Sequence, residues 1–229
     1  MKKYFLVYND GTHVNYLEHL LDSVRTFNKD FEIIVFNKEQ IDYEFRNKNA
    51  NILNEPRGGG YWLWKPYIIN KTLKNINDGD LLFYLDSKYY FMKDFTELYL
   101  KHMENRDILV WKNKPNEPTF WMSNWCKMSV LHKYGLCDMV FNEEINISWA
   151  GAIFLRKSKI SVDVVNEWLQ MCCIYEDISD SPSDITNSSS FYEHRHDQSL
   201  LTIVLIKYNI CLEYFEKGII QNLRALYKV

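Results

Sequence analysis

Asp86 follows directly on the apolar run LLFYL, and Lys88 stands two residues further on. A nearly unbroken apolar run of this length is typical of a central β-strand that is covered on both faces. Ligands of open parallel α/β sheets bind beyond the carboxyl ends of the strands, where Tyr8 and Asn9 also follow an apolar run. Asp86 is therefore a candidate ligand-binding carboxylate, and a plain turn residue is the alternative.

Lys65 is a second candidate. At helical spacing it shares a face with Trp62 and Ile69, and this face is expected to meet the sheet. A lysine on such a face must either extend its ammonium group to solvent or meet an anion. The glycines at positions 58–60 offer backbone N–H groups at a helix start, as in phosphate-binding sites, and Arg57 adds charge. The alternative is a flexible glycine connection, with Lys65 in solvent.

A third cluster lies in the segment EHRHDQS, residues 193–199. His194 and His196 alternate along an extended segment and so point the same way, which suits a metal ion or a diphosphate. Arg195 adds a positive charge between them. Asp197 either takes part in this site or acts as the N-cap of the apolar helix that follows.

Hydrophobic periodicity predicts the elements that must position these residues. Strand, helix and strand over residues 3–10, 15–27 and 31–37 indicate a parallel βαβ unit. Further strands are expected over residues 81–86, 107–112 and 148–156, and further helices over residues 62–76, 95–103, 163–175 and 196–209. The polar segment 176–190 is expected to be a mobile lid or an acceptor-binding loop.

Length and composition bound the class of protein. The 229 residues fit one domain, and 47% hydrophobic residues provide a packed core. A net charge of -3 gives no basic field, so no nucleic-acid partner is expected. Five cysteines without a C-x-x-C pair argue against a zinc knuckle or a disulfide framework. We find no signal peptide and no run long enough for a transmembrane segment, which predicts a cytoplasmic protein, with peripheral membrane association left open.

The motifs GYWLWKPYIINKTL, LLFYLD, WAGAIFLRKS and EHRHDQSLL resemble, in this order, those of small GT-A-fold glycosyltransferases of bacterial and viral surface-glycan type. The resemblance covers about residues 4–207 and includes similarity to glycogenin-like and lipooligosaccharide galactosyltransferases. It implies an α/β fold, a single GT-A domain over residues 1–229 with a mixed, mainly parallel central sheet flanked by helices. It also implies a nucleotide-sugar donor, with a UDP-sugar favoured, and a glycan or other acceptor hydroxyl.

The resemblance also assigns roles to residues. Tyr8 and Asn9 would cradle the nucleotide base, and Asp86 matches the first aspartate of the D-x-D motif, which holds ribose and metal. Ala150 and Gly151 match an N-A-G segment that borders the donor sugar.

Trp149 stands where that segment has its asparagine. Lys65 resembles a basic residue that contacts the donor. HDQSLL resembles a D-Q-D-x-L-N segment whose middle residue faces the anomeric carbon, so Asp197 and Gln198 are the expected catalytic residues.

Lys88 departs from the D-x-D pattern, whose second aspartate binds the metal. The metal neutralises the departing diphosphate, and a lysine can supply part of that charge. In one arrangement, Asp86 and the histidines of the 194–196 segment hold Mn²⁺ or Mg²⁺, which is the cofactor that the resemblance implies. In the other arrangement, Lys88, Lys65 and Arg195 take the place of the metal.

The sequence therefore predicts a glycosyltransferase that retains the anomeric configuration, in which Gln198, a poor nucleophile, stabilises the charge that forms at the sugar. An inverting enzyme would instead need a carboxylate base, for which Glu143, Glu144 and Asp138 are candidates. Two other functions stay open. They are a non-catalytic nucleotide-sugar-binding domain and a metal-dependent hydrolase built on the H-x-H-D cluster.

Overall fold

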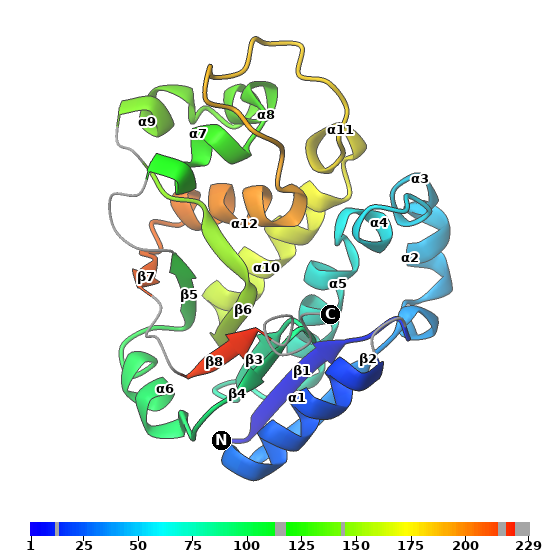
Figure 1. The fold of residues 1–229 in the computed structure, drawn as a ribbon, viewed down its shortest axis with the longest axis vertical. Helices are drawn as coiled ribbons and strands as arrows, with labels where there is room; N and C mark the ends of the chain where they lie inside the picture. The colour runs from blue at the N-terminus through cyan, green and yellow to red at the C-terminus, as the bar shows by residue number, and fades with distance from the viewer. Residues whose placement is uncertain (12–13, 113–117, 143–144, 215–218, 223–229) are drawn as a thin grey trace.

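Figure 1 shows the computed structural model, which describes residues 1–11, 14–112, 118–142, 145–214 and 219–222. Within these segments a six-stranded sheet has the strand order β2-β1-β3-β6-β5-β7. The strands are β1 (Lys3–Tyr8), β2 (Phe31–Phe36), β3 (Leu81–Leu85), β5 (Ile108–Lys112), β6 (Ser148–Arg156) and β7 (Glu213–Tyr214). A smaller antiparallel pair consists of β4 (Tyr89–Phe91) and β8 (Ile220–Asn222).

The direction of the strands confirms a mixed, mainly parallel sheet. β1 pairs in parallel with both β2 and β3, so the predicted βαβ unit is present and includes α1 (Val14–Phe27). β6 runs antiparallel to β3 and β5, and β7 runs parallel to β5. Because β1 and β3 are parallel, Tyr8 and Asp86 reach the same edge of the sheet.

Helices cover both faces of the sheet, which explains why its central strands are apolar throughout. Side chains alternate along β1, where Leu6 faces one buried cluster while Phe5 and Val7 face the other. The first cluster is covered by α5 (Trp64–Asn75), α10 (Lys159–Cys172) and α12 (His196–Lys207), and the second by α1, α6 (Thr96–His102) and the β4–β8 pair (Figure 1).

Short helices complete the described chain. They are α2 (Tyr43–Lys48), α3 (Ala50–Leu53), α4 (Gly58–Tyr61), α7 (Met122–Trp125), α8 (Met128–Lys133), α9 (Cys137–Asn142) and α11 (Tyr175–Ile178), with the 3₁₀ turns η1 (Lys38–Gln40) and η2 (Pro118–Phe120). All five cysteines are free thiols. No helix in the described segments combines the length and the apolar character needed to cross a membrane.

The segment that precedes α5 is a left-handed turn. Five successive residues have positive φ, with values of 61°, 59° and 95° at Gly58, Gly59 and Gly60, then 51° at Tyr61 and 61° at Trp62. A left-handed conformation costs roughly 1–2 kcal/mol at a residue that carries a Cβ atom, and glycine avoids this cost. The turn is also why α5 begins at Trp64 and not at Trp62, where the periodicity places it.

Two of the three glycine N–H groups that were expected to cradle a phosphate are used within the turn. The N–H groups of Gly59 and Gly60 donate to the carbonyls of Pro56 and Glu55, at 3.3 and 2.9 Å. The turn therefore uses these groups to hold its own shape. Gly60 also allows a close approach, because a Cβ atom there would lie 2.7 Å from the Cα atom of Leu53.

We expect Gly60→Ala to lower the free energy of unfolding by about 3 kcal/mol, since it adds a steric overlap with backbone to the cost of positive φ. Gly79→Ala is the matched control. Gly79 also has positive φ, at 85°, but a Cβ atom there meets nothing within 4 Å, so the expected loss is about 1 kcal/mol. Urea denaturation of both variants measures the difference, and equal losses would contradict the close packing at Gly60.

Candidate functional site

Asp86 lies immediately after β3, at the carboxyl edge of the sheet, and both of its oxygens are engaged. The Tyr84 hydroxyl donates to Oδ1 at 2.7 Å. The backbone N–H of Asp86 donates to the Gly151 carbonyl at 2.9 Å, which ties this residue to β6. The chain turns directly after Asp86, so Lys88 folds back and places its Nζ 3.2 Å from Oδ2.

Lys65 lies on the buried face of α5, and only 4% of its surface is exposed. Its Nζ is 2.9 Å from Asp197 Oδ2 and 3.6 Å from Asp86 Oδ1. Of the two alternatives for this lysine, the one in which it meets an anion is therefore confirmed. Burial works to lower the pKa of Lys65, but the two carboxylates outweigh it and hold the pKa above its ordinary value.

Asp197 is not the N-cap of α12. That position belongs to Arg195, and Asp197 lies in the first turn, where its carboxylate faces Lys65. Burial raises the pKa of Asp197 to about 6, against the opposing effect of the Lys65 ammonium. Burial also works to raise the pKa of Asp86, but there Lys65 and Lys88 outweigh it and lower the pKa.

Three residues other than glycine have positive φ and lie close together beside the Lys65–Asp197 ion pair. His196, with φ at 49°, stacks on Tyr61, with ring centroids 4.8 Å apart and planes inclined by 25°. The Trp62 ring lies 5.5 Å from the same imidazole. Strained backbone of this kind persists only where its surroundings fix it, and here the two strained segments pack against each other.

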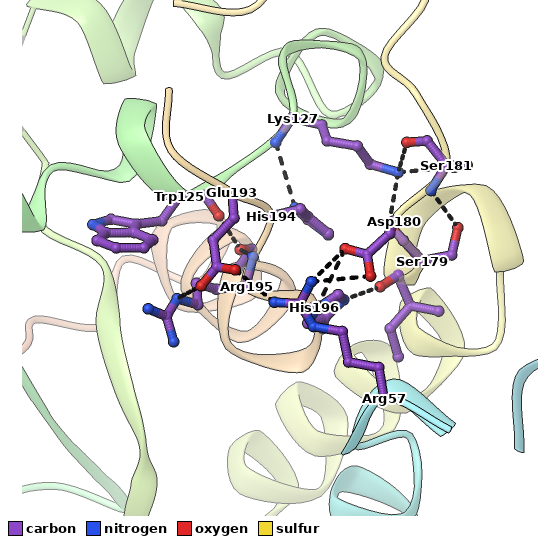
Figure 2. A network of polar contacts seen from close by, with 12 residues as sticks. Arg57, Trp125, Lys127, Ser179, Asp180, Ser181, Glu193, His194, Arg195 and His196 are labelled. Carbon is purple, nitrogen blue, oxygen red and sulfur yellow. Dashed lines mark hydrogen bonds and ion pairs between the residues drawn. The ribbon is translucent and has the colours of Figure 1, made fainter. Parts of the chain in front are cut away.

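Arg57 and Arg195 belong to a polar network (Figure 2). Arg57 pairs with Asp180 at 3.0 Å and with Glu193 at 2.6 Å. Glu193 also pairs with Arg195 at 2.9 Å, and the Arg195 guanidinium stacks over the Trp125 ring at 4.3 Å. In the structure these two arginines join segments of the chain through ion pairs, and their expected contact with the donor stays a prediction.

The two histidines are held by backbone carbonyls. His194 Nε2 donates to the Asp177 carbonyl at 2.7 Å, and His196 Nδ1 donates to the Ile178 carbonyl at 2.7 Å. Burial lowers the pKa of both imidazoles, so both are neutral at pH 7. His196 Nε2 has no hydrogen-bond partner, and the carboxylate oxygen 3.7 Å from it belongs to Asp180, which Arg57 already neutralises.

The expected metal ligands Asp86, His194 and His196 are therefore not brought together. No three His, Cys, Asp or Glu side chains gather as possible metal ligands anywhere in the described segments. The Asp86 oxygens face two ammonium groups and a hydroxyl, and these are not the surroundings of a ligand to a divalent cation. The side chains present do not fit the metal that the resemblance implies.

Lys127 was missed by sequence reasoning, although a lysine inside the otherwise apolar WCKM segment is a usable signal. It is 3% exposed, and its Nζ donates to the carbonyls of Glu176, Ser179 and Ser181 and to the Ser181 hydroxyl, at 2.6–3.1 Å (Figure 2). Burial lowers the pKa of this lysine. The start of the 176–190 segment is thus anchored, and its role as a lid or acceptor loop stays a prediction.

Two adjoining cavities open at the carboxyl edge of the sheet. The larger, of about 570 Å³, lies between the end of β1 and the η1–α3 segment. The smaller, of about 330 Å³, contains Asp86 and Lys88 in its wall. Tyr8, Asp10, Pro56 and Gly59 line both cavities, so the two adjoin, and we refer to them together as the crevice.

Several expected donor-binding residues meet in the smaller cavity: Tyr8, Asn9, Asp86 and Lys88. The structure adds Tyr16, Trp62, Trp64 and Tyr84, which sequence reasoning did not assign to the site. Ala150 and Gly151 lie on β6 beside Asp86, but Ala150 is fully buried. A Cβ atom at Gly151 would lie 3.2 Å from Asp86 Oδ2, so this glycine lets the carboxylate approach the strand.

The fold matches those of solved glycosyltransferase structures. An apo structure of the bifunctional glycosyltransferase WbbM superposes with a TM-score of 0.55 at 12% identity and covers 93% of this chain. Mouse xyloside xylosyltransferase 1 superposes with a TM-score of 0.52 at 10% identity and covers 94% of this chain. The chain has the GT-A fold.

The chain spans less than half of one of these proteins and most of the other. The chain spans 38% of the WbbM chain and 86% of the xylosyltransferase chain. No family model matches the sequence, and no curated protein matches it. The sheet that carries Asp86 at its edge is seen directly in the structure. Its assignment to the GT-A fold rests on structural similarity alone.

The pKa of Asp197 predicts a pH dependence of stability. The folded-state pKa, about 6, lies above the unfolded value near 3.8, so folding favours the protonated carboxyl. Its contribution to stability is complete below pH 4 and is lost as the pH rises through 6, which amounts to about 3 kcal/mol. Asp197→Asn removes this titration. The free energy of unfolding of the native protein, relative to that of the variant, should fall between pH 4 and 7, and a constant difference would refute the assignment.

Proposed function

We propose that the protein is a glycosyltransferase that moves a sugar from a nucleotide-diphosphate donor, with a UDP-sugar favoured, to a hydroxyl group of a glycan or similar acceptor. The observation that carries this proposal is the crevice at the carboxyl edge of a GT-A sheet, with Asp86 and Lys88 in its wall. Ligands of α/β sheets bind at this edge. The glycosyltransferase neighbours supply the reaction class.

The two cavities suit the two parts of such a donor. The larger cavity brings together Asn47, Asn54, Lys38 and Arg46, whose amides and cations can hydrogen-bond a nucleobase and ribose. Tyr8 lies between the cavities and stacks on Trp64, with ring centroids 3.9 Å apart, which gives the crevice a rigid aromatic wall. The diphosphate and the sugar would then lie in the smaller cavity.

The transfer step breaks the bond between the anomeric carbon and the diphosphate oxygen, and the bonding electrons leave with the nucleoside diphosphate. The acceptor oxygen forms the new bond to the anomeric carbon, and its proton passes to the departing diphosphate. Gln198 follows Asp197 in the first turn of α12 and is half-buried. Its amide oxygen would stabilise the positive charge that builds up on the sugar.

The other functions considered are less well supported. An H-x-H-D hydrolase needs several metal ligands, and no three His, Cys, Asp or Glu side chains gather as possible ligands in the described segments. Asp138, a candidate base for inversion, is exposed on α9 and, like Gln198, lines neither cavity of the crevice, so retention is proposed on the resemblance of the HDQSLL segment. Glu143 and Glu144 lie outside the described residues. A non-catalytic binding domain is distinguished by a turnover assay.

Nucleotide binding tests the crevice directly. We expect UDP, in a titration panel with GDP and dTDP, to bind with a dissociation constant in the micromolar range, about −8 kcal/mol. Ala50→Tyr fills the larger cavity and should weaken binding at least tenfold. Asn51→Tyr is the control, because Asn51 is exposed on the same helix and lines neither cavity. Absence of binding by every nucleotide, or equal affinity of both variants, would count against the proposal.

The stereochemistry of the product tests the role of Gln198. With retention, the glycosidic bond formed has the anomeric configuration of the donor, which NMR of the product reports. Gln198→Ala should lower kcat about 100-fold with little change in KM, because the amide acts on the transition state. Gln170→Ala on α10 is the control. An inverted product would overturn the retaining mechanism while leaving sugar transfer intact.

A further inference from the structure

The two carboxylates that face Lys65 are already neutralised by lysines. Asp86 faces Lys65 at one oxygen and Lys88 at the other, and Asp197 faces Lys65. When both carboxylates are ionised, two ammonium groups balance two negative charges. A divalent cation placed at Asp86 would stand next to both ammonium groups and would be repelled by them.

Lys88 is the member of this cluster that can reach a ligand. Lys65 is buried beneath the crevice, whereas the Lys88 side chain is 37% exposed and lines the smaller cavity. The Tyr89 ring lies 5.3 Å from its Nζ and supports it from one side. An ammonium group has three N–H donors, and Asp86 takes one of them, so the others can bond to an anion in the cavity.

The histidines do not supply an alternative metal site. His194 Nδ1 accepts from the Lys127 backbone N–H at 3.4 Å. His196 Nε2 has no hydrogen-bond partner, but the nearby Asp180 is paired with Arg57, and no three His, Cys, Asp or Glu side chains gather as a ligand set in the described segments. Arg195 is paired with Glu193 and stacked on Trp125, so it does not add charge to the crevice either. The positive charge that faces the smaller cavity next to Asp86 is therefore that of Lys88.

We infer that the protein binds the diphosphate of its donor through Lys88 in place of a divalent cation, so that neither nucleotide binding nor sugar transfer requires a metal. This inference rests on the proposed function. As the bond to the anomeric carbon breaks, negative charge builds up on the departing diphosphate oxygen. The Lys88 ammonium donates hydrogen bonds to the diphosphate and stays protonated, while the proton of the acceptor hydroxyl leaves with the nucleoside diphosphate.

Calorimetric titration of UDP into the whole chain, in EDTA and in Mn²⁺, tests the inference. We expect dissociation constants that agree within about twofold. Binding that is at least tenfold tighter in Mn²⁺ would overturn the inference and leave the proposed function standing. Absence of UDP, GDP and dTDP binding in both buffers would overturn the two together, so the two failures are distinguishable.

Variants at position 88 identify the group responsible. Lys88→Ala should weaken UDP binding in EDTA at least tenfold, and inorganic pyrophosphate should cease to compete. Lys93→Ala is the control, because Lys93 is exposed and lines neither cavity. Lys88→Asp restores a carboxylate pair and should make binding depend on Mn²⁺. Equal affinity of the two alanine variants, with native thermal unfolding of both, would refute the role of Lys88.

Discussion

The ammonium group of Lys65 is the charge on which the arrangement of the site depends. A buried charge without a partner is unfavourable by several kcal/mol, and two carboxylates face this lysine. Asp86 follows β3 directly, Asp197 lies in the first turn of α12, and Lys65 lies in the first turn of α5. Satisfying one buried charge therefore fixes the ends of three elements relative to one another, and the crevice lies where they meet.

The backbone close to Lys65 is strained. The turn from Gly58 to Trp62 must reverse its hand before α5 can begin, and two of its residues bear the cost of positive φ. Those residues, Tyr61 and Trp62, pack on His196, which has positive φ as well. Arg57, at the start of the turn, forms ion pairs with Asp180 and Glu193 (Figure 2). The buried ion pairs of Lys65 and the more exposed ion pairs of Arg57 thus fix the same two segments, which are the turn before α5 and the start of α12. The crevice therefore has a wall that is formed before a ligand binds.

The parts that could be predicted from the sequence are those that local periodicity determines. The strands, the position of Asp86 at the sheet edge and the burial of Lys65 all follow from which residues share a face. The hand of the 58–62 turn does not, because glycine permits many conformations and favours none. The partners of Arg57 lie 123 and 136 residues away, beyond any local pattern. The H-x-H spacing suits metal ligands and carbonyl-bonded histidines equally, and tertiary packing decides between them.

The turn after β3 determines which group Lys88 contacts, and strand alternation does not predict that contact. Had the strand continued, the side chains of Asp86 and Lys88 would have shared a face at a spacing that suits a chelating carboxylate pair. The chain turns instead, and the ammonium of Lys88 folds onto Asp86. A partly exposed ion pair contributes little to stability, so Lys88 can exchange one hydrogen bond to Asp86 for one to an incoming diphosphate at little cost. Before a donor binds, Asp86 keeps the Lys88 side chain in position. After Lys88 has turned to the diphosphate, Lys65 stays in place and keeps Asp86 neutralised.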